Sequence, residues 1–404
     1  MVEPEIRIED YNYNLTDDKI AKYPLESRDA SRILIFRDNL ISESKFSNLT
    51  ELLPEKSLLI FNNTRVVPAR LIFRKESGAY IEIFCLEPYI PAEYNRSFSS
   101  TSSCSWKAVV GNAKRWKSGE ILFDSGCDAL LSEIDLRASI ETRLDDKFII
   151  NFRWSLDIPF SQVMEMCGKV PIPPYLHRES KDSDRERYQT LYAKERGSVA
   201  APTAGLHFTQ TLLKEIDNST VERGEICLHV GAGTFIPVKS ELIIDHKMHS
   251  EPFSIEIALL KKILNKLKAQ EKIVAVGTTT VRTLESLYYL GVQCKEKGIP
   301  KDVTQWEPYN QIKEYSKIDA LQALIFWMES KNMEVLERKT EIIIVPGYIF
   351  KIADVLITNF HQPKSTLLLL ISAFIGDKWR EMYEYALKSD FRFLSYGDSS
   401  ILFR

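Results

Sequence analysis

The stretch KIVAVGTTTVRTLE, residues 272–285, decides the fold class of this chain. Its first five residues, 272–276, suit a buried strand, and Gly277 ends that strand. Apolar residues then recur at helical spacing from Thr278 onward. A strand that passes through one glycine into a helix is typical of α/β proteins. The stretch therefore predicts an α/β domain.

Similar patterns on both sides of this stretch extend the prediction. Buried strands are predicted at 32–36, 57–61, 342–345 and 355–358, and helices at 257–267, 318–328, 367–374 and after the capping residue Thr209. The stretch 288–340 is otherwise polar, and we interpret its helix as a surface element. Short alternating segments between Leu71 and Leu156 predict instead a small all-β module. We expect a discontinuous α/β domain, 1–70 and 157–404, with a β-barrel domain inserted at 71–156.

Composition narrows the class of protein. The chain has 404 residues, of which 44% are hydrophobic and 27% charged, and its formal net charge is -3, so disorder and nonspecific coating of nucleic acid are both disfavoured. Six cysteines without a C-x-x-C pair indicate reduced thiols. The first residues do not resemble a signal peptide, and the most apolar run, 366–375, is about half the length of a membrane span. We expect a cytoplasmic protein.

Two glycine-containing stretches carry polar side chains at the ends of predicted elements. In AAPTAGLHF, residues 200–208, Thr203 and His207 precede a helix start, where free N–H groups can hold an anion. A helix-entry turn with a locally satisfied histidine is the alternative. In LHVGAGTFIP, residues 228–237, a G-x-G turn permits close approach of a ligand, although a β-bulge explains it equally well.

Three further stretches contain groups that exchange protons or bind anions. DHKMHSE, residues 245–251, favours proton transfer over a metal site, with a solvated loop as the alternative. In 277–285, Arg282 and Glu285 share one helical face, either beside a bound carboxylate or as an internal ion pair. The stretches 358–365 and 391–400 place His361 and Asp398 in turns.

Arginines and tyrosines suggest where RNA binds. The stretch 62–70 presents Arg65 and Arg70, and the stretch 171–192 interleaves arginines with tyrosines, a mixture that can hold phosphates and stack bases. Acidic residues in 171–192 weaken this signal, because most such runs are solvated helix faces. The RNA-binding candidates are Arg65, Arg70, Arg178, Arg185 and Tyr188.

Taken together and in order, these segments resemble the S-adenosylmethionine:tRNA ribosyltransferase-isomerase family of queuosine biosynthesis. The resemblance rests on RDASR from Arg28, NNTRVVPAR from Asn62, PPY from Pro173, DRERYQTLYA from Asp184, AAPTAGLHFT from Ala200, LHVGAGTFIPV from Leu228, DHKMHSE from Asp245, VGTTTVRTLES from Val276, PGY from Pro346, LITNFHQPKST from Leu356 and FRFLSYGDSS from Phe391. Two departures are Gln362, where a leucine is usual, and the pair 399–400 after SYGD.

The resemblance implies a reaction and its partners. The ribosyl part of S-adenosylmethionine is moved to 7-aminomethyl-7-deazaguanine at the tRNA wobble position, giving epoxyqueuosine while adenine and methionine leave. S-adenosylmethionine is consumed as a co-substrate, and no metal or other cofactor is expected. The implied fold is a barrel-like α/β domain with an inserted β-barrel, and we expect a monomer.

That chemistry assigns candidate roles to the residues singled out above. A base must remove a proton next to the sulfonium, and an acid must assist the departure of adenine. The base candidates are His246, His249 and His207, oriented by Asp245 or Glu251, and the acid candidates are Asp398 and His361. For S-adenosylmethionine we expect Thr203, Gly231, Gly233, Thr234, Thr278, Arg282 and Glu285, with Phe208 or Glu285 against the sulfonium and Arg282 or the helix start at Thr278 against the methionine carboxylate.

Two rival functions remain open at the level of sequence. An S-adenosylmethionine-dependent methyltransferase is disfavoured because Phe36 is followed by Arg37, Asp38 and Asn39 rather than by a glycine-rich loop. A non-catalytic RNA-binding protein would need the arginines and tyrosines but not the histidines. The released products distinguish these rivals from ribosyl transfer.

Overall fold

The computed structural model describes residues 5–126, 128–145, 147–231, 238–310 and 313–404. Its larger domain is built on a nine-stranded mixed sheet in the order β15-β13-β12-β3-β14-β16-β17-β1-β2. The strands are β1 (Arg32–Arg37), β2 (Leu40–Lys45), β3 (Leu58–Asn62), β12 (Glu222–Leu228), β13 (Glu251–Glu256), β14 (Ile273–Val276), β15 (Val335–Thr340), β16 (Val355–Asn359) and β17 (Ser399–Phe403). The predicted α/β class is confirmed. The described strands leave β15 and β2 as edges, so this sheet is open where the resemblance implied a barrel-like form.

Helices cover both faces of this sheet because successive residues of its buried strands point to opposite sides. On one face, Leu58 and Ile60 pack with residues of α7 (Ile257–Lys268), α8 (Thr278–Lys297), α9 (Lys317–Ser330), α10 (Thr366–Ile375) and α11 (Lys378–Lys388). On the other face, Leu59 and Phe61 pack with α1 (Leu49–Leu52) and α6 (Gln210–Asp217). The side chain of Thr209 caps α6 as predicted, by accepting a hydrogen bond from the N–H of Leu212.

The inserted module is a closed antiparallel barrel, which confirms the second part of the predicted fold class. Its order is β10-β7-β6-β5-β8-β9. The elements are β5 (Arg70–Arg74), β6 (Tyr80–Ile90), α2 (Tyr94–Phe98), β7 (Ser103–Gly111), β8 (Ile121–Phe123), α3 (Ala129–Glu133), β9 (Arg137–Arg143) and β10 (Phe148–Arg153). Trp106, Phe73 and Phe152 are among the fully buried residues of its core. The strands run from Arg70 to Arg153; the domain bounds themselves stay a prediction.

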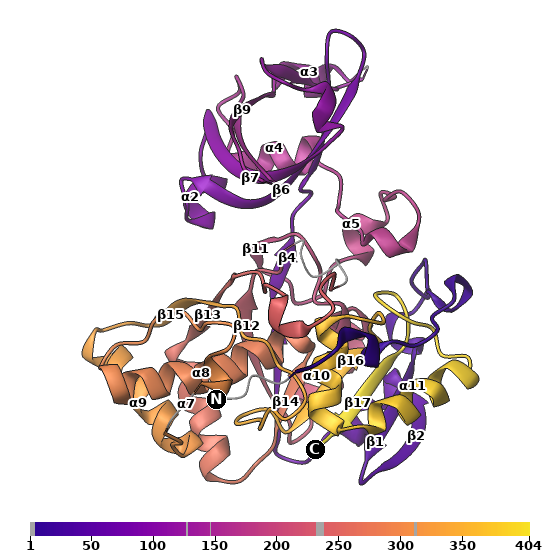
Figure 1. Ribbon diagram of the computed structural model, residues 1–404, viewed down its shortest axis with the longest axis vertical. Helices are drawn as coiled ribbons and strands as arrows, with labels where there is room; N and C mark the ends of the chain where they lie inside the picture. The colour runs from indigo at the N-terminus through magenta and orange to yellow at the C-terminus, as the bar shows by residue number, and fades with distance from the viewer. Residues whose placement is uncertain (1–4, 127, 146, 232–237, 311–312) are drawn as a thin grey trace.

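A short two-stranded ribbon and two connections join the barrel to the larger domain (Figure 1). The ribbon pairs β4 (Thr64–Val66) with β11 (Glu195–Ser198) in parallel. The chain leaves the barrel through α4 (Phe160–Cys167) and Gly168, and a Cβ at Gly168 would lie 1.9 Å from the carbonyl oxygen of Pro68. Only glycine fits at this crossing. The short α5 (Asp184–Arg187) follows before β11.

Two predictions about the larger domain are wrong. Residues 342–345 form no strand, because their backbone instead faces Arg282, whose Nε donates to the carbonyl of Ile342 at 3.1 Å. The stretch 288–340 is not a surface element, since it supplies the second half of α8, all of α9 and edge strand β15. Helix α9 places Leu321, Leu324 and Met328 in the core, so the surrounding polar residues hid a structural helix.

Two features bear on the expected surroundings of the protein. Within the described ranges, no helix combines the length and the apolar character that spanning a bilayer requires. The cysteines that the structure describes are all free thiols.

Candidate active site

The ends of six neighbouring strands meet at one edge of the nine-stranded sheet. Strands β12, β3, β14 and β16 are parallel to one another and finish at this edge. Strand β17 is antiparallel to β16, pairing Ser399 with Asn359, and β1 is parallel to β17, so both begin there. Polar turns that are distant in the sequence therefore lie together, at the carboxyl ends of parallel strands where α/β proteins commonly bind ligands.

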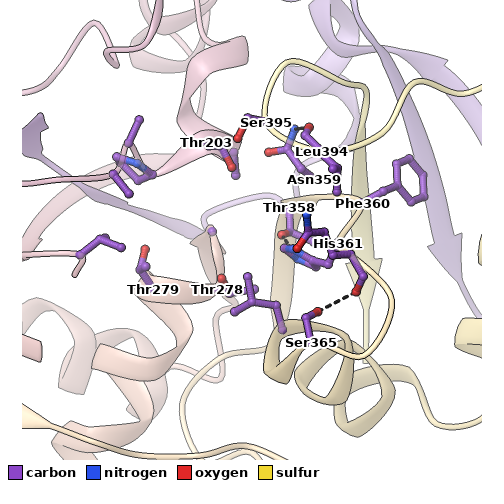
Figure 2. A pocket seen from close by; sticks show the side chains of 18 of the residues that line it. Thr203, Thr278, Thr279, Thr358, Asn359, Phe360, His361, Ser365, Leu394 and Ser395 are labelled. Carbon is purple, nitrogen blue, oxygen red and sulfur yellow. Dashed lines mark hydrogen bonds between the residues drawn. The ribbon is translucent and has the colours of Figure 1, made fainter. Parts of the chain in front are cut away.

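A first chamber opens at this edge and is shown in Figure 2. Residues after β14, before α6 and after β16 form its walls, among them Thr278, Thr203 and His361. Phe360 belongs to the lining, but its ring points away from the other labelled side chains. The remaining lining residues include Tyr175, Ala200, Ala201, Pro202, Val230, Gly277, Thr279, Thr358, Asn359, Gln362, Ser365, Leu367, Leu394 and Ser395.

A second chamber adjoins the first. Ser365 and Leu367, at the start of α10, line both cavities, so the two chambers form one cleft around that helix start. The second chamber also includes His246, His249, Met248, Glu251, Arg282, Ile342, Ile343, Ile344, Thr366 and Leu370. Free N–H groups and the positive end of the helix dipole make such a helix start favourable for an anionic group.

Asn359 leaves one buried acceptor without a protein partner in the first chamber. Its Nδ2 donates to the carbonyl oxygens of Leu394 at 3.2 Å and Asp398 at 3.4 Å, and it lies 3.1 Å from Nε2 of His207. These partners fix the orientation of the amide. Its Oδ1 is buried and has no partner among the described residues. An uncompensated buried acceptor is costly, so this oxygen is available to a ligand that donates a hydrogen bond.

Thr279 provides a second such atom on the opposite wall (Figure 2). Helix α8 begins at Thr278 after Gly277, which has a φ of +89° and so favours glycine. The hydroxyl of Thr279 has no described partner, whereas the hydroxyl of the next residue, Thr280, donates to the carbonyl of Val276 at 2.6 Å. Neighbouring threonines thus differ: Thr280 is satisfied inside the helix and Thr279 is not.

Arg282 brings a partly used guanidinium to the second chamber. Its Nη1 forms an ion pair with Glu251, and both side chains are buried, with 8% and 4% exposed. Glu251 also accepts from the N–H of Gly231 at 3.3 Å. Nη2 of Arg282 is buried without a described partner. The chamber therefore holds one spare charged donor beside a helix start, a combination that suits a carboxylate.

Burial lowers the pKa of two histidines of the cleft, His361 and His246. Burial lowers the pKa of His361 to about 3; one ring nitrogen lies 3.0 Å from the hydroxyl of Thr358, and the other has no hydrogen bond to the described part of the chain. Burial, followed by the charge of His249, lowers the pKa of His246. A neutral imidazole accepts a proton but is not an acid, so the acid role predicted for His361 is not supported.

His207 lies behind the first chamber and is satisfied on both ring nitrogens. Nδ1 is 2.8 Å from the hydroxyl of Ser31, and Nε2 is 3.1 Å from Nδ2 of Asn359. Burial lowers its pKa to about 4. The alternative reading of this stretch, a locally satisfied histidine at a helix entry, therefore describes it better than the base role, and His207 positions Asn359.

Three other predicted roles disagree with the geometry. Glu285 is fully buried and accepts from the hydroxyl of Tyr348 and the N–H groups of 351–353, so it has no access to a sulfonium. Asp398 is held by the N–H groups of Arg32 and Arg392 and by the Arg392 guanidinium, which disfavours its acid role. Phe208 is buried edge-on against Phe46 and Phe61 rather than in the cleft.

Only some of the remaining residues that were predicted to bind the ligand line the cleft. Thr203 and Thr278 line the first chamber, and His246 and His249 line the second. Gly231 lies next to the cleft through its hydrogen bond to Glu251, whereas Asp245 is exposed at the end of a short 3-10 helix. Gly233 and Thr234 lie outside the described residues.

The predicted RNA-binding residues divide into free and structural side chains. Arg65 is exposed and has no ion pair to a described residue, whereas Arg70 is paired with Glu82. Arg178 forms two hydrogen bonds with the buried Asp184, and Arg185 donates to the carbonyls of Glu165 and Gly168 at the exit from the barrel. Tyr188 is fully buried and out of reach of a base. The roles predicted for Arg178, Arg185 and Tyr188 are therefore structural here.

Sequence reasoning missed several lining residues, chiefly Thr358 and Ser395, and indicated Thr279 only as part of the helix start at 278–280. Each lies near a strand end within a motif already singled out. The sequence therefore indicated where the residue lies, but not whether its side chain points into the cleft. Only the coordinates show which of these side chains have hydrogen-bond partners and which do not. Over the ranges that the structure describes, no group of three histidine, cysteine or carboxylate side chains is arranged to hold a metal ion.

Comparisons with known proteins come from three directions. A family model described as "Queuosine biosynthesis protein" matches residues 8–402. Relatives named S-adenosylmethionine:tRNA ribosyltransferase-isomerase include one from Trichlorobacter lovleyi, 35% identical over 98% of this chain and 99% of its own, and one from Desulfitobacterium hafniense, 37% identical over 98% and 100%. A crystal structure of S-adenosylmethionine tRNA ribosyltransferase from Thermotoga maritima is 27% identical, covers 97% of this chain and 99% of that chain, and has a TM-score of 0.46.

Proposed function

This chain belongs to the queuosine biosynthesis protein family and is an enzyme of the S-adenosylmethionine:tRNA ribosyltransferase-isomerase type, and we propose that the two-chamber cleft is its active site. The proposed reaction moves the ribosyl part of S-adenosylmethionine to the aminomethyl group of 7-aminomethyl-7-deazaguanine at the tRNA wobble position. Adenine and methionine leave, and the sugar becomes the epoxycyclopentanediol of epoxyqueuosine. S-adenosylmethionine is the only small co-substrate in this proposal.

The observation that carries the proposal is the spare Nη2 of Arg282 in the second chamber. S-adenosylmethionine has a carboxylate at one end, a sulfonium in the middle and adenosine at the other end. We place the carboxylate on Arg282 and on the free N–H groups at the start of α10. The ion pair with Glu251 holds the guanidinium in place, so little side-chain entropy is lost when the ligand binds.

The ribose and adenine then occupy the first chamber, through the passage at Ser365 and Leu367. Ribose hydroxyls and the adenine amino group are hydrogen-bond donors, and Oδ1 of Asn359 is the unused acceptor there. The hydroxyl of Thr279 serves as donor or acceptor on the opposite wall. The sulfonium lies near the passage, where the two chambers meet.

His246 is the base that this arrangement favours. It lines the second chamber, and burial keeps it neutral without removing its basicity as far as that of His361. A neutral imidazole near the passage is in a position to accept the proton that the sulfonium acidifies. His361 faces the first chamber, where we assign it a hydrogen bond to the substrate. His249 lines the same chamber as His246 and remains the alternative base.

Product analysis tests the reaction. Incubation of the enzyme with S-adenosylmethionine and tRNA that carries 7-aminomethyl-7-deazaguanine should release adenine and methionine in equal amounts. Release of S-adenosylhomocysteine would support the rival methyltransferase and contradict the proposal. RNA binding with no small product would support a non-catalytic RNA-binding protein.

A ligand without a carboxylate tests the assignment of Arg282. Decarboxylated S-adenosylmethionine should bind the wild-type protein about 30-fold to 100-fold more weakly than S-adenosylmethionine, since a lost charged hydrogen bond costs about 2 kcal/mol or more. The E251Q/R282Q variant removes both buried charges but keeps the start of α10, so its preference for S-adenosylmethionine over the decarboxylated ligand should be much smaller than that of the wild type. The same preference in the variant as in the wild type would refute the assignment.

The finer statements about partners and location are also proposals. We propose that the protein acts as a monomer in the cytoplasm, with tRNA and S-adenosylmethionine as its partners. The free thiols of the described cysteines support a reducing compartment. Sedimentation of the enzyme with and without tRNA measures the oligomeric state directly.

A further inference from the structure

We propose that a small pocket behind the first chamber binds a backbone phosphate next to the modified tRNA nucleotide. This inference rests on the proposed function for the identity of the RNA. The pocket is lined by three arginines, Arg28, Arg187 and Arg392, together with Ser31, His207 and Tyr396. We call it the arginine pocket. Arg187 belongs to the stretch 171–192, whose arginines and tyrosines suggested RNA binding from the sequence, whereas Arg28 and Arg392 were not singled out as RNA contacts.

The arginine pocket has more positive than negative charge. Arg28 donates to the carbonyls of Gln189, Leu206 and Glu186, and Arg187 donates to those of Leu25 and Glu26. Neither has a carboxylate within ion-pair distance in the described part of the chain. Arg392 alone is paired, with Asp398 at 3.1 Å. Three guanidinium groups therefore share one carboxylate.

The effect of this excess charge is visible on neighbouring groups. Burial lowers the pKa of Arg28, and the charge of Arg187 lowers it further. At His207, burial is the largest cause of the lowered pKa; Asp398 opposes it, whereas Arg392 and Arg28 add to it. Converging like charges destabilise a fold unless an anion joins them. The geometry thus favours an anionic ligand.

One donor in the pocket remains unused. Nε of Arg187 is buried and has no hydrogen-bond partner among the described residues. Its two Nη atoms are both bound to backbone carbonyls, so the guanidinium is fixed before a ligand arrives. A fixed guanidinium with a spare N–H suits an oxygen of a phosphate.

The position of the pocket indicates which phosphate it takes. Ser395 lines both the arginine pocket and the first chamber, so the two cavities share a wall. A wobble base that approaches the ribose bound in the first chamber brings its own flanking phosphates close to this wall. The pocket is much smaller than the two chambers and admits one tetrahedral anion rather than a nucleotide. We therefore assign it to a phosphodiester on one side of the wobble nucleotide.

The test combines substitutions in the protein with neutral phosphates in the RNA. The variants are R187Q, R187K and R392Q. R223Q is the control, because Arg223 lies at the end of β12 that is away from the cleft and is paired with Asp217. The RNA is an anticodon stem-loop with 7-aminomethyl-7-deazaguanine, in which one phosphate at a time is replaced by a methylphosphonate. Affinity for RNA, affinity for S-adenosylmethionine and thermal stability are measured for each protein.

We expect R187Q and R392Q to bind the unmodified stem-loop about tenfold more weakly and to lower the slope of log affinity against log salt by about one unit. Affinity for S-adenosylmethionine should not change, and R223Q should match the wild type. One methylphosphonate beside the wobble nucleotide should weaken wild-type binding tenfold and leave R187Q unaffected. R187K should recover part of the affinity, because it restores the charge but not the bonds to Leu25 and Glu26.

Three results would overturn the inference. The first is unchanged RNA affinity in both R187Q and R392Q. The second is equal sensitivity of the wild type and R187Q to every methylphosphonate. The third is a loss of RNA affinity in R187K as large as in R187Q, together with a matching loss of thermal stability. Inorganic phosphate is tested alone, and phosphate binding that R187Q abolishes without any effect on RNA would identify free phosphate as the occupant and reject RNA. Failure of the wild type to release adenine would instead reject the proposed function.

Discussion

The two-chamber cleft and the ion pair between Arg178 and Asp184 both contain buried polar side chains, but they differ in how those side chains are satisfied. In the ion pair, Asp184 accepts from Arg178, and it also accepts from the N–H of Lys181 and from the hydroxyl of Tyr396. In the cleft, the hydroxyl of Thr279, Oδ1 of Asn359 and Nη2 of Arg282 have no partner among the described residues.

This difference predicts different consequences for substitutions in the two places. A buried polar group that is fully paired stabilises one arrangement of the chain, whereas an unpaired one costs free energy until a ligand arrives. Substitution of a paired group should therefore reduce stability, and substitution of an unpaired group should reduce binding. The following experiments test that contrast.

The largest effect is expected at the ion pair between Arg178 and Asp184. Asp184→Ala leaves the Arg178 guanidinium, which is only 10% exposed, without its carboxylate. Loss of one partner from a buried ion pair costs about 3–5 kcal/mol. Urea unfolding should show this loss, whereas the Kd for S-adenosylmethionine of the protein that remains folded should not change. A stable D184A protein with weakened ligand binding would reverse the contrast.

Acid should destabilise the protein through its buried histidines. The pKa of His361 is lowered to about 3 and that of His207 to about 4, so below the unfolded value of about 6.5 only the unfolded chain takes up these protons. Stability should fall by about 1.4 kcal/mol per pH unit for each histidine as the pH drops from 6.5 to 4.

His361→Gln and His207→Gln distinguish the two histidines. Both variants should flatten the dependence of stability on pH. At pH 7, H207Q should be the less stable protein, because His207 has partners on both ring nitrogens and His361 on one. Chemical denaturation between pH 4 and 7 measures both quantities. An unchanged slope in either variant would show that the histidine is not buried in its neutral form.

The fold was more predictable from sequence than the site. The strand at 272–276 and the helix that follows it were visible because the apolar residues of a strand and of a helix recur at different periodicities. Residues 342–345 have the composition of a buried strand, but their backbone groups are held by the side chains of Arg282, Tyr309 and Thr340 rather than by a neighbouring strand. Such a contact leaves no periodic signal.

The site was predictable as a set of motifs but not as a set of roles. Arg282 and Glu285 are three residues apart on α8, yet Arg282 reaches the cleft and Glu285 binds the backbone at 351–353. Both are charged residues on the same face of α8, but their partners come from distant parts of the chain. Those partners decide whether a group is free to act, and sequence periodicity does not encode them.

Adjacent threonines at the start of α8 offer the most closely matched pair of substitutions. Thr279→Val removes a hydroxyl without a described partner and should weaken S-adenosylmethionine binding about tenfold while stability is unchanged. Thr280→Val removes a hydrogen bond within the helix and should cost about 1 kcal/mol of stability without an effect on binding. Calorimetric titration and thermal unfolding of both variants check the pair, and the opposite pattern would contradict the account.

The smallest effect is expected on the ribbon between the domains. Arg65 and Arg196 lie opposite each other on β4 and β11; both are exposed, and neither has an ion pair to a described residue. Each substitution by glutamine should lower the salt dependence of tRNA binding by about one unit, with a loss of affinity of a few fold. Arg70→Gln is the paired control, because Arg70 is occupied by Glu82. Equal effects of the Arg65 and Arg70 substitutions on tRNA binding would contradict the distinction between unpaired and paired arginines.

The central claim is that S-adenosylmethionine spans both chambers of the cleft, and a structure of the complex tests it most directly. The account predicts the methionine carboxylate within hydrogen-bond distance of Nη2 of Arg282, with adenosine between Thr279 and Asn359. It is contradicted if S-adenosylmethionine binds with its carboxylate elsewhere and Oδ1 of Asn359, the hydroxyl of Thr279 and Nη2 of Arg282 make no contact with it.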